Sequence, residues 1–337
     1  MIVEATKKLV CGESLSTGEA SEVMGQIMDG VPSDAQFGAF VTALHMKGES
    51  ASEIAAMGAV MRERSLKVES AYPALVDTCG TGGDGKDTFN ISTAVALVMA
   101  GAGARVAKHG NRAATSRCGS ADVLEALGVK IELTPVEVAE CIDVAGIGFM
   151  YAPIFHPAMK FAAPLRREIA IPTTFNLLGP ITNPARANRQ LLGVARLELV
   201  ELMADAICEM GIQFAQVVHG LDGLDEISIS GPSMIATVDA GKVKIVETSP
   251  EQFGLEISSI DEIAGGGASH NAELIRNILQ GSTGACRDIV ILNAAAGLVV
   301  AGVVTEMLQG VHIAAEAIDN GAAFNSLEKL ISVSNRN

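Results

Sequence analysis

From residue 74 onward, short runs of strand-forming residues alternate with longer stretches of helical periodicity. We expect strands at residues 75–79, 105–108, 129–132, 149–152, 190–195 and 214–220, and helices near 92–103, 120–127, 135–145 and 197–211. Further strand-like runs lie at 234–240 and 242–247, followed by Ala-rich helices. Alternation of this kind is typical of βαβ units, whose strands are parallel. The pattern predicts an α/β fold with a mostly parallel central sheet flanked by helices.

The first 70 residues show helical patterns only. Three capping boxes recur every 17 residues, at Ser16, Ser33 and Ser50, each with Glu or Gln three positions later. We therefore expect an all-helical N-terminal domain over residues 1–71, joined by helices from 157–187, with 156–170 itself helical in pattern. Residues 72–156 and 188–337 are expected to form the α/β domain.

Composition narrows the class of protein. The chain has 337 residues, is 49% hydrophobic and carries a net charge of −15, which argues against non-specific binding of nucleic acid or anionic membranes. We find no signal-peptide pattern and no strongly apolar run long enough for a membrane span. The six cysteines are at least 23 residues apart, without a metal or disulfide spacing. These features predict a soluble cytoplasmic protein with reduced thiols.

A polar, glycine-rich stretch interrupts the apolar segments at residues 77–93. "DTCGTGGDGKDTFNIST" holds four glycines, five hydroxyls and three carboxylates, more glycine than a plain turn needs. "GTGGDG" matches the dinucleotide fingerprint, but residues 86–91 delay the following helix, and the next strand ends in basic "VAKHGNR". The dinucleotide interpretation is therefore weak, although some ligand must approach this backbone closely.

The region after this stretch lacks acidic residues. The 34 residues between Asp87 and Asp122 contain no carboxylate but include Arg105, Lys108, Arg112 and Arg117 and six hydroxyls, in a chain with 39 acids. Such a region favours an anion, with glycine-loop N–H groups, hydroxyls at a helix N-terminus and a lysine charge as ligands. Two loops of this kind, at 80–93 and 108–120, predict a ligand with two phosphate groups.

Three acids stand near this predicted anion site. Asp84 lies within the glycine loop, and Asp225 and Glu226 follow a strand in "HGLDGLDEIS". Hard oxygen ligands beside phosphates favour Mg²⁺, which bridges phosphate oxygens. On its own, an acidic pair on a loop is usually a solvated surface pair, so the metal prediction depends on the neighbouring phosphate loops.

Longer motifs carry a family resemblance over nearly the whole chain. "GTGGDG", "NIST", "KHGNRAATSRCGSADVLEALGV", "HPAMKFAAPLRREI", "FNLLGPITNPA" and "GLDE" together resemble the anthranilate phosphoribosyltransferase family. The resemblance implies a nucleoside phosphorylase-like phosphoribosyltransferase fold and a homodimer through the helical domains. It also implies transfer of a 5-phosphoribosyl group from 5-phosphoribosyl 1-pyrophosphate to the amino group of anthranilate, in tryptophan biosynthesis.

The resemblance also assigns site residues. For the phosphoribosyl pyrophosphate donor it implies contacts from Gly80, Gly83, Asp84, Thr88, Asn90, Ile91, Ser92, Thr93, Lys108, His109, Gly110, Asn111, Arg112, Ala113, Ala114, Thr115, Ser116 and Ser120. For Mg²⁺, expected as two ions, it implies Ser92, Asp225 and Glu226. For anthranilate it implies Gly80, Asn111 and Arg166, with His109 and His156 lining the approach.

The expected chemistry needs no covalent nucleophile. An aryl amine is a poor nucleophile, so catalysis depends on positioning and on stabilising the leaving pyrophosphate. His109 or His156 is a possible acceptor of the amine proton. Two alternatives stay open at this point: an enzyme like pyrimidine nucleoside phosphorylase, which the glycine loop and "GLDE" disfavour, and a non-catalytic nucleic-acid-binding relative, which the net charge of −15 disfavours.

Overall fold

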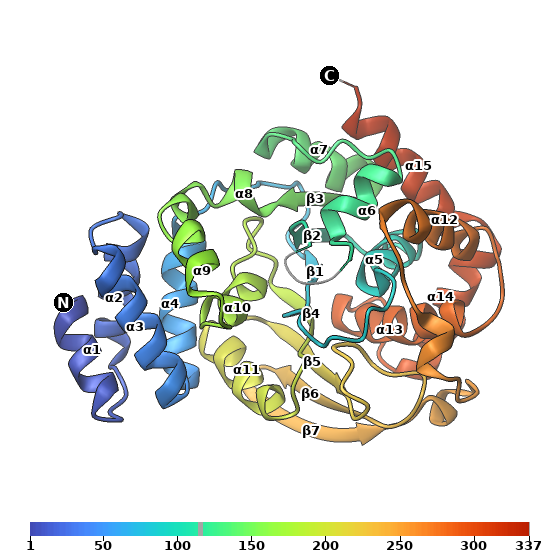
Figure 1. Cartoon of the computed structure of the whole chain (residues 1–337). Coiled ribbons are helices and arrows are strands. Elements are labelled where there is room, and N and C mark those ends of the chain that lie inside the picture. Colours follow the sequence, from blue (N-terminus) through green and yellow to red (C-terminus); the bar gives the residue numbers. More distant parts are fainter. Residues whose placement is uncertain (114–116, 337) are drawn as a thin grey trace.

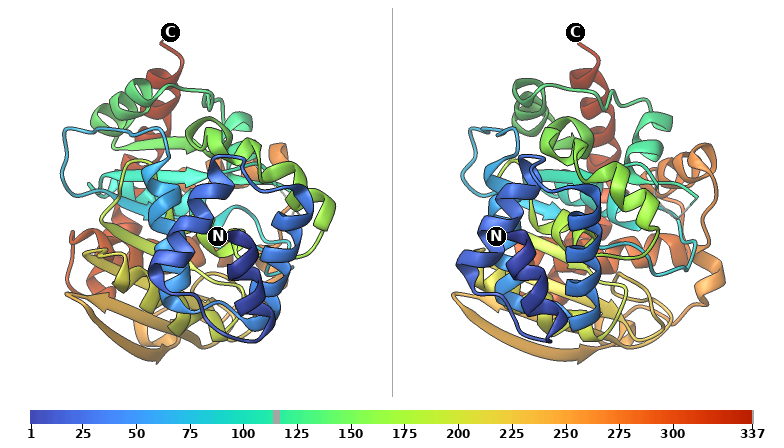
Figure 2. Two further views of the ribbon diagram at one scale, coloured as in Figure 1. Left: turned by 90° about the vertical axis from the view of Figure 1, so that its left-hand side faces the viewer. Right: turned by 60° about the vertical axis from the view of Figure 1, so that its left-hand side comes forward.

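The chain forms an N-terminal helical bundle beside a seven-stranded sheet that is covered by helices (Figure 1). The structure is a computed structural model and describes residues 1–113 and 117–336. Figure 2 turns the bundle toward the viewer, with its helices in front of the sheet. No helix in these ranges combines the length and the apolar character needed to cross a membrane.

The bundle contains α1 (Ile2–Val10), α2 (Thr17–Met28), α3 (Asp34–Lys47) and α4 (Ala51–Glu63). All three predicted capping boxes are confirmed: the side chains of Ser16, Ser33 and Ser50 accept hydrogen bonds from the main chain three residues later. Each cap satisfies a helix N–H that would otherwise lack a partner, an effect of about 1 kcal/mol. Local sequence therefore determines where these helices begin.

Short helices from the middle of the chain lie between the sheet and the bundle, and the second and third of them pack on bundle helices. They are α8 (Ala152–Phe155), α9 (Ala163–Ile169) and α10 (Phe175–Leu178), with 3₁₀ turns at Pro157–Lys160 and Gly179–Ile181. The helical pattern expected over 156–170 is confirmed but divided in two: Pro157 opens the 3₁₀ turn and Pro164 lies in the first turn of α9, where the missing N–H of proline is tolerated. The rings of Phe37 in α3 and Phe175 in α10 lie 5.9 Å apart, and the division into domains stays a prediction.

The sheet has the order β3-β2-β1-β4-β5-β6-β7. Its strands are β1 (Val76–Thr78), β2 (Val106–Gly110), β3 (Ile147–Tyr151), β4 (Arg189–Gly193), β5 (Phe214–Gly220), β6 (Ser233–Asp239) and β7 (Lys242–Thr248). The first five strands in this order pair in parallel, and β6 pairs antiparallel with both β5 and β7. The predicted α/β class with a mostly parallel sheet is confirmed.

Helices cover both faces of the sheet. They are α5 (Ile91–Gly101), α6 (Ser120–Ala126), α7 (Pro135–Ala145), α11 (Glu198–Glu209), α12 (Ala268–Leu279), α13 (Ala285–Ala301), α14 (Met307–Asp319) and α15 (Ala322–Ser334). Neighbouring strand residues enter different cores: Leu191 packs in the cluster with α5 and α13, and Leu192 in the cluster with α11 and the bundle. β2, β3 and β4 are buried along nearly their whole length, as is typical of parallel strands covered on both faces.

The strand expected over 129–132 is wrong. Val129, Ile131 and Leu133 are buried and alternate with more exposed residues, but this segment pairs with no strand. It lies instead against α15, where the N–H of Lys130 donates to Ser334 Oγ at 3.2 Å. The alternation shows that one face of this segment is buried. A helix can cover that face as well as a sheet can.

Candidate active site

The loops with the predicted site residues converge at the carboxyl ends of β1, β2 and β5. β1 continues through α5 to β2 on one side, while β4 lies on its other side, so the strand order reverses between β1 and β4. Ligands of open α/β sheets bind at such a reversal. A small cavity opens there, lined by Thr78, Cys79, Gly80, Ser92, Val95, Leu191, Gly193 and Glu226.

The glycine-rich stretch forms an irregular loop before α5. Gly82, Gly83 and Gly85 have φ of +62°, +84° and +68°, in the left-handed region that favours glycine. A Cβ on Gly83 or Gly85 would meet no protein atom within 4 Å, so one side of this backbone is open to a ligand. Because α5 begins only at Ile91, the loop lacks the immediate helix start of a dinucleotide site.

Three carboxylates crowd together beside this loop. Burial and the neighbouring Asp84 carboxylate raise the pKa of Asp225, and burial together with Asp225 raises the pKa of Glu226 well above its usual range. The Oδ2 atom of Asp84 is buried without a hydrogen-bond partner. Crowded carboxylates with an unsatisfied oxygen suit a hard divalent cation.

A Mg²⁺ ion at this site would need oxygen ligands from the substrate as well as from the protein. No group of three or more His, Cys, Asp or Glu within residues 1–113 and 117–336 is arranged to hold a metal ion. Mg²⁺ usually binds one or two carboxylates and completes its shell with water and phosphate oxygens. Asp225, Glu226 and the neighbouring Ser92 therefore fit a Mg²⁺ that arrives with a phosphorylated ligand.

Lys108 lies beneath the glycine loop rather than on its surface. Its Nζ donates to the Thr78 carbonyl at 2.5 Å, to Thr78 Oγ1 at 3.2 Å and to Ser92 Oγ at 3.3 Å. The pKa of this ammonium is lowered, because the effect of burial exceeds the opposite effect of the nearby Asp77 and Glu226 carboxylates. A direct phosphate contact, as the sequence predicts, needs one of these protein contacts to be exchanged.

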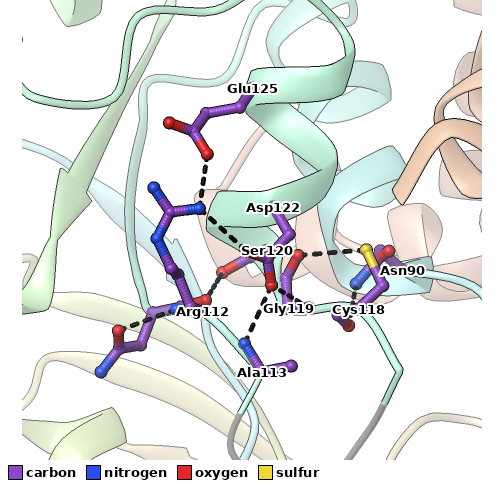
Figure 3. Close-up of polar contacts among 9 residues, drawn as sticks. Asn90, Arg112, Ala113, Cys118, Gly119, Ser120, Asp122 and Glu125 are labelled. Atoms are coloured by element: carbon purple, nitrogen blue, oxygen red, sulfur yellow. Dashed lines mark hydrogen bonds and ion pairs between the residues drawn. The ribbon is translucent and has the colours of Figure 1, made fainter. Parts of the chain in front are cut away.

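The second loop, between β2 and α6, is closed at its neck by Asp122 (Figure 3). The Asp122 carboxylate accepts hydrogen bonds from the N–H groups of Ala113 at 3.0 Å and Gly119 at 2.9 Å. A Cβ on Gly119 would lie 2.3 Å from the Ala113 nitrogen, so the two ends of the loop touch. The predicted residues Ala114, Thr115 and Ser116 lie outside the described residues.

The arginines of the acid-free region, which we expected to favour an anion, contact other parts of the protein instead. The Arg112 guanidinium pairs with Asp122 at 2.9 Å and with Glu125 at 2.5 Å, and Arg117 pairs with Asp87 at 3.4 Å. Arg105 precedes β2, at the opposite end of the sheet, and donates to the carbonyls of Ile142 and Asp143. Arg105 therefore contributes nothing to a ligand contact at the carboxyl ends.

Other predicted donor residues lie on the same two loops. The side chains of Ile91 and Thr93 are buried, and Thr93 Oγ1 has no hydrogen-bond partner among the described residues, so this hydroxyl and the two main chains remain for a ligand. Thr88 forms a bridge to Ala264, and Ser120 Oγ donates to the Asn111 carbonyl at 3.3 Å. A Cβ on Gly80 would lie 3.0 Å from Asp225 Oδ2, so the start of the loop contacts the carboxylates directly.

His109 and His156 meet between β2 and the segment that follows α8. Their ring centroids lie 5.0 Å apart. Burial lowers the pKa of His109 to about 3 and that of His156 to about 4, so both imidazoles are neutral at pH 7. The Nε2 atom of His156 is buried without a hydrogen-bond partner. A neutral imidazole with a free nitrogen can accept a proton or a ligand hydrogen bond.

Arg166 in α9 is a partly buried cation. It donates to Asn176 Oδ1 at 3.4 Å and lies 5.2 Å from the ring centroid of Phe175, and burial lowers its pKa. It forms no ion pair with an acid in the described parts of the chain. A desolvated guanidinium without a carboxylate partner suits a ligand carboxylate.

Sequence reasoning did not single out several polar residues that organise these loops. Asp77, with a pKa that burial raises to about 6, accepts from the His109 N–H at 3.1 Å and from Asn183 Nδ2 at 2.7 Å. Asn183 Nδ2 also donates to the Ala107 carbonyl at 2.8 Å. Asp122 and Asn271 are further examples. Position is the only sequence signal that marks two of them: Asp77 precedes the glycine-rich loop, and Asn271 follows the glycines at 265–267.

Comparisons with known proteins identify relatives of the whole chain. The model described as "Glycosyl transferase family, helical bundle domain" matches residues 3–65, and "Glycosyl transferase family, a/b domain" matches 72–324. A protein of Dehalococcoides mccartyi named anthranilate phosphoribosyltransferase is 54% identical over 336 residues, covering 99% of this chain and 98% of the relative.

Solved structures give the same result. Anthranilate phosphoribosyltransferase from Thermus thermophilus superposes with a TM-score of 0.92 at 42% identity, covering 98% of this chain and 99% of that one. The Saccharomyces cerevisiae enzyme in complex with PRPP and Mg has a TM-score of 0.89 at 28% identity, covering 99% and 97%. The same yeast enzyme was also solved with 4-fluoroanthranilate, with a TM-score of 0.88, 28% identity and coverage of 99% and 97%. This chain belongs to the anthranilate phosphoribosyltransferase family.

Proposed function

We propose that this chain transfers the 5-phosphoribosyl group of 5-phosphoribosyl 1-pyrophosphate to the amino group of anthranilate and releases pyrophosphate. The observation that carries the proposal is the meeting of an open glycine loop with the Asp225 and Glu226 carboxylates at the strand-order reversal. The yeast relative binds PRPP with Mg and an anthranilate analogue, which supports both substrates. The product would serve tryptophan biosynthesis.

The donor is expected to lie over the two loops. The backbone at Gly83 and Gly85 has open space on its Cβ side, where a pyrophosphate can approach it, and oxygen anions accept hydrogen bonds from the N–H groups of such glycine loops. The loop closed by Asp122 presents further groups to the donor, with Asn111 and Ser120 at its ends. Lys108 contributes a buried positive charge below both loops.

Mg²⁺, when bound, would neutralise negative charge that develops on the leaving pyrophosphate. Asp225, Glu226 and Ser92 are the residues that would hold it, and two ions remain our prediction. The carboxylates must be ionised for this role, and their raised pKa values show that the folded protein alone does not favour that state.

For the acceptor, we assign the carboxylate of anthranilate to Arg166. The amine nitrogen attacks the anomeric carbon as the bond to pyrophosphate breaks, and the new C–N bond leaves a proton on nitrogen to be removed. His109 and His156 are neutral at pH 7 because burial disfavours their charged forms, so either imidazole can accept that proton. Positioning and leaving-group stabilisation supply the rest of the rate.

We also propose a homodimer formed through the helical bundle and retain the cytoplasmic location predicted from the sequence. Large apolar side chains stand exposed on the bundle: Val10 is 74%, Val31 69% and Met46 82% exposed. Exposed large apolar side chains on the bundle are the observation that supports an interface there.

The deciding experiment follows anthranilate fluorescence with the purified chain, 5-phosphoribosyl 1-pyrophosphate and Mg²⁺. We expect fluorescence to fall only when all three are present, with one pyrophosphate released per anthranilate consumed. A parallel assay offers a pyrimidine nucleoside with inorganic phosphate. Activity in the second assay and none in the first would favour the phosphorylase alternative and reject the proposal.

A further inference from the structure

A third glycine-rich segment, at residues 264–267, packs against the donor loop. The N–H of Gly265 donates to the Asp87 carbonyl at 2.8 Å, and Ala264 forms a bridge with Thr88. A Cβ on Gly265 would lie 2.5 Å from the Thr88 oxygen and 2.6 Å from the Phe89 nitrogen. Only glycine allows this approach, so the segment forms a backing for residues 87–89 of the donor loop.

Asn271, in the first turns of α12, connects this segment to the donor site. Its side chain is 1% exposed. The Oδ1 atom accepts from the Gly266 N–H at 2.7 Å, and Nδ2 donates to Asn90 Oδ1 at 2.9 Å. The Gly266 N–H can only donate, which determines the orientation of the Asn271 amide.

Asn90 passes this connection to the second loop. Its Nδ2 donates to the main-chain carbonyl of Cys118 at 3.0 Å (Figure 3). Asn90 lies just before α5 in the first donor loop, and Cys118 lies in the second, next to the Gly119 that Asp122 holds. The two amides therefore form one chain of hydrogen bonds from the 264–267 segment through both donor loops.

We propose that Asn271 is a positioning residue for the donor: it orients Asn90 and thereby keeps the two donor loops in register. The inference rests on the proposed function, because it concerns how the same site binds its phosphorylated substrate. Asn271 itself is buried, so it contacts no ligand, and it reaches the second loop mainly through Asn90 and also through a hydrogen bond with the Cys118 side chain. Both polar ends of the Asn90 side chain are occupied by protein, so we assign Asn90 a bridging role, with its main chain facing the donor.

The consequence is selective for one substrate. Loss of the Asn271 amide frees Asn90 to rotate, and loops that are no longer pre-organised bind the donor less tightly. We expect Asn271→Ala to weaken the donor about tenfold, the size typical of one lost buried hydrogen bond. Anthranilate, assigned to Arg166, should keep its Michaelis constant within about twofold, as expected for an interaction that the substitution does not reach.

A double-mutant cycle with Asn271→Ala, Asn90→Ala and the double variant tests the inference. Calorimetry with 5-phosphoribosyl 1-pyrophosphate and Mg²⁺ gives donor affinity, and steady-state kinetics gives both Michaelis constants. If Asn271 acts mainly through Asn90, Asn271→Ala weakens the donor in the native background and has a much smaller effect in the Asn90→Ala background, where only its contact with Cys118 is left to lose. Additive effects, or equal loss for both substrates, would overturn the inference.

Two further variants keep the result decisive. Asn277→Ala changes an exposed asparagine on the same helix and should leave donor affinity unchanged. Asn271→Asp keeps the acceptor for Gly266 but places an oxygen against Asn90 Oδ1, and it replaces Asn271→Ala in the cycle if that variant fails to fold. Its donor defect should become much smaller with Asn90→Ala, and a defect of undiminished size would reject the inference. Failure of the native protein to bind the donor would instead reject the proposed function.

Discussion

The main-chain N–H of Gly82 donates a hydrogen bond of 3.0 Å to the carboxylate of Asp225. This contact joins the glycine loop after β1 to the loop after β5, 143 residues later. It also places Asp225 beside Asp84, whose charge helps to raise the pKa of Asp225. The folded protein therefore brings carboxylates together at a cost in free energy, and a cation bound with the donor relieves that cost.

Asp225→Asn should separate metal binding from folding. The amide keeps an acceptor for Gly82 but removes one charge, so the Mg²⁺ concentration for half-maximal activity should rise at least about tenfold. The raised pKa of Asp225 means that its ionised form opposes folding, so the melting temperature of the metal-free variant should not fall. Glu198→Gln, at an exposed acid, is the control. An unchanged Mg²⁺ titration would remove Asp225 from the metal site.

Gly119→Ala should open the neck of the second loop. The added Cβ would lie 2.3 Å from the Ala113 nitrogen and 2.4 Å from the Arg112 carbonyl carbon, so the main chain must move and the Asp122 contacts must lengthen. We expect a loss of about 1–3 kcal/mol in the free energy of unfolding and weaker donor binding. Gly231→Ala, where a Cβ meets no atom within 4 Å, should change neither. Denaturant unfolding and calorimetry provide both measurements.

Local signals predicted most of the fold. Capping boxes located three helix starts, because a cap depends on residues only three positions apart. The α/β alternation predicted the parallel sheet, since buried parallel strands require helical crossovers. The strand expected at 129–132 failed because apolar alternation shows that one face is buried and does not identify the covering element, which here is α15.

The site was predicted unevenly for a related reason. Residues that would contact a ligand stand in motifs such as "GTGGDG" and "GLDE" and were proposed directly from the sequence. Residues that hold those motifs in place are distant in sequence: Asn271 meets Asn90 across 181 residues, and Asn183 meets Asp77 across 106. Only the folded chain brings such pairs together, because no local pattern marks a buried amide as the partner of a loop.

His156 should contribute to the pH dependence of stability. Burial lowers its pKa from 6.5 to about 4, so as pH falls from 6.5 the unfolded chain takes up a proton before the folded chain does. The free energy of unfolding is therefore lost between pH 6.5 and 4, by at most about 3 kcal/mol from this group.

His156→Gln should flatten that part of the profile relative to the native protein. Asp77, whose pKa is raised to about 6, acts in the opposite direction, but it is present in both proteins and cancels in the comparison. Denaturant unfolding at several pH values measures the difference. Parallel profiles for the two proteins would show that folding does not lower the pKa of His156.

Arg166 and its neighbour Arg167 allow a matched test of the anthranilate assignment. Arg166 is partly buried, lies 5.2 Å from the Phe175 ring centroid and donates to Asn176 Oδ1, whereas Arg167 is exposed. A guanidinium that is already desolvated loses little on meeting a carboxylate, and its planar fork binds both oxygens.

Arg166→Ala should raise the Michaelis constant for anthranilate about ten- to a hundredfold, because a hydrogen bond to a charged group contributes about 1.5–3 kcal/mol. The constant for the donor should change little, since no phosphate is assigned to α9. Arg166→Lys keeps the charge without the fork and should recover only part of the affinity, and Arg167→Ala should affect neither substrate. Steady-state kinetics with each substrate varied in turn gives all these values. Equal effects on both substrates, or a larger effect at Arg167, would place the anthranilate carboxylate elsewhere.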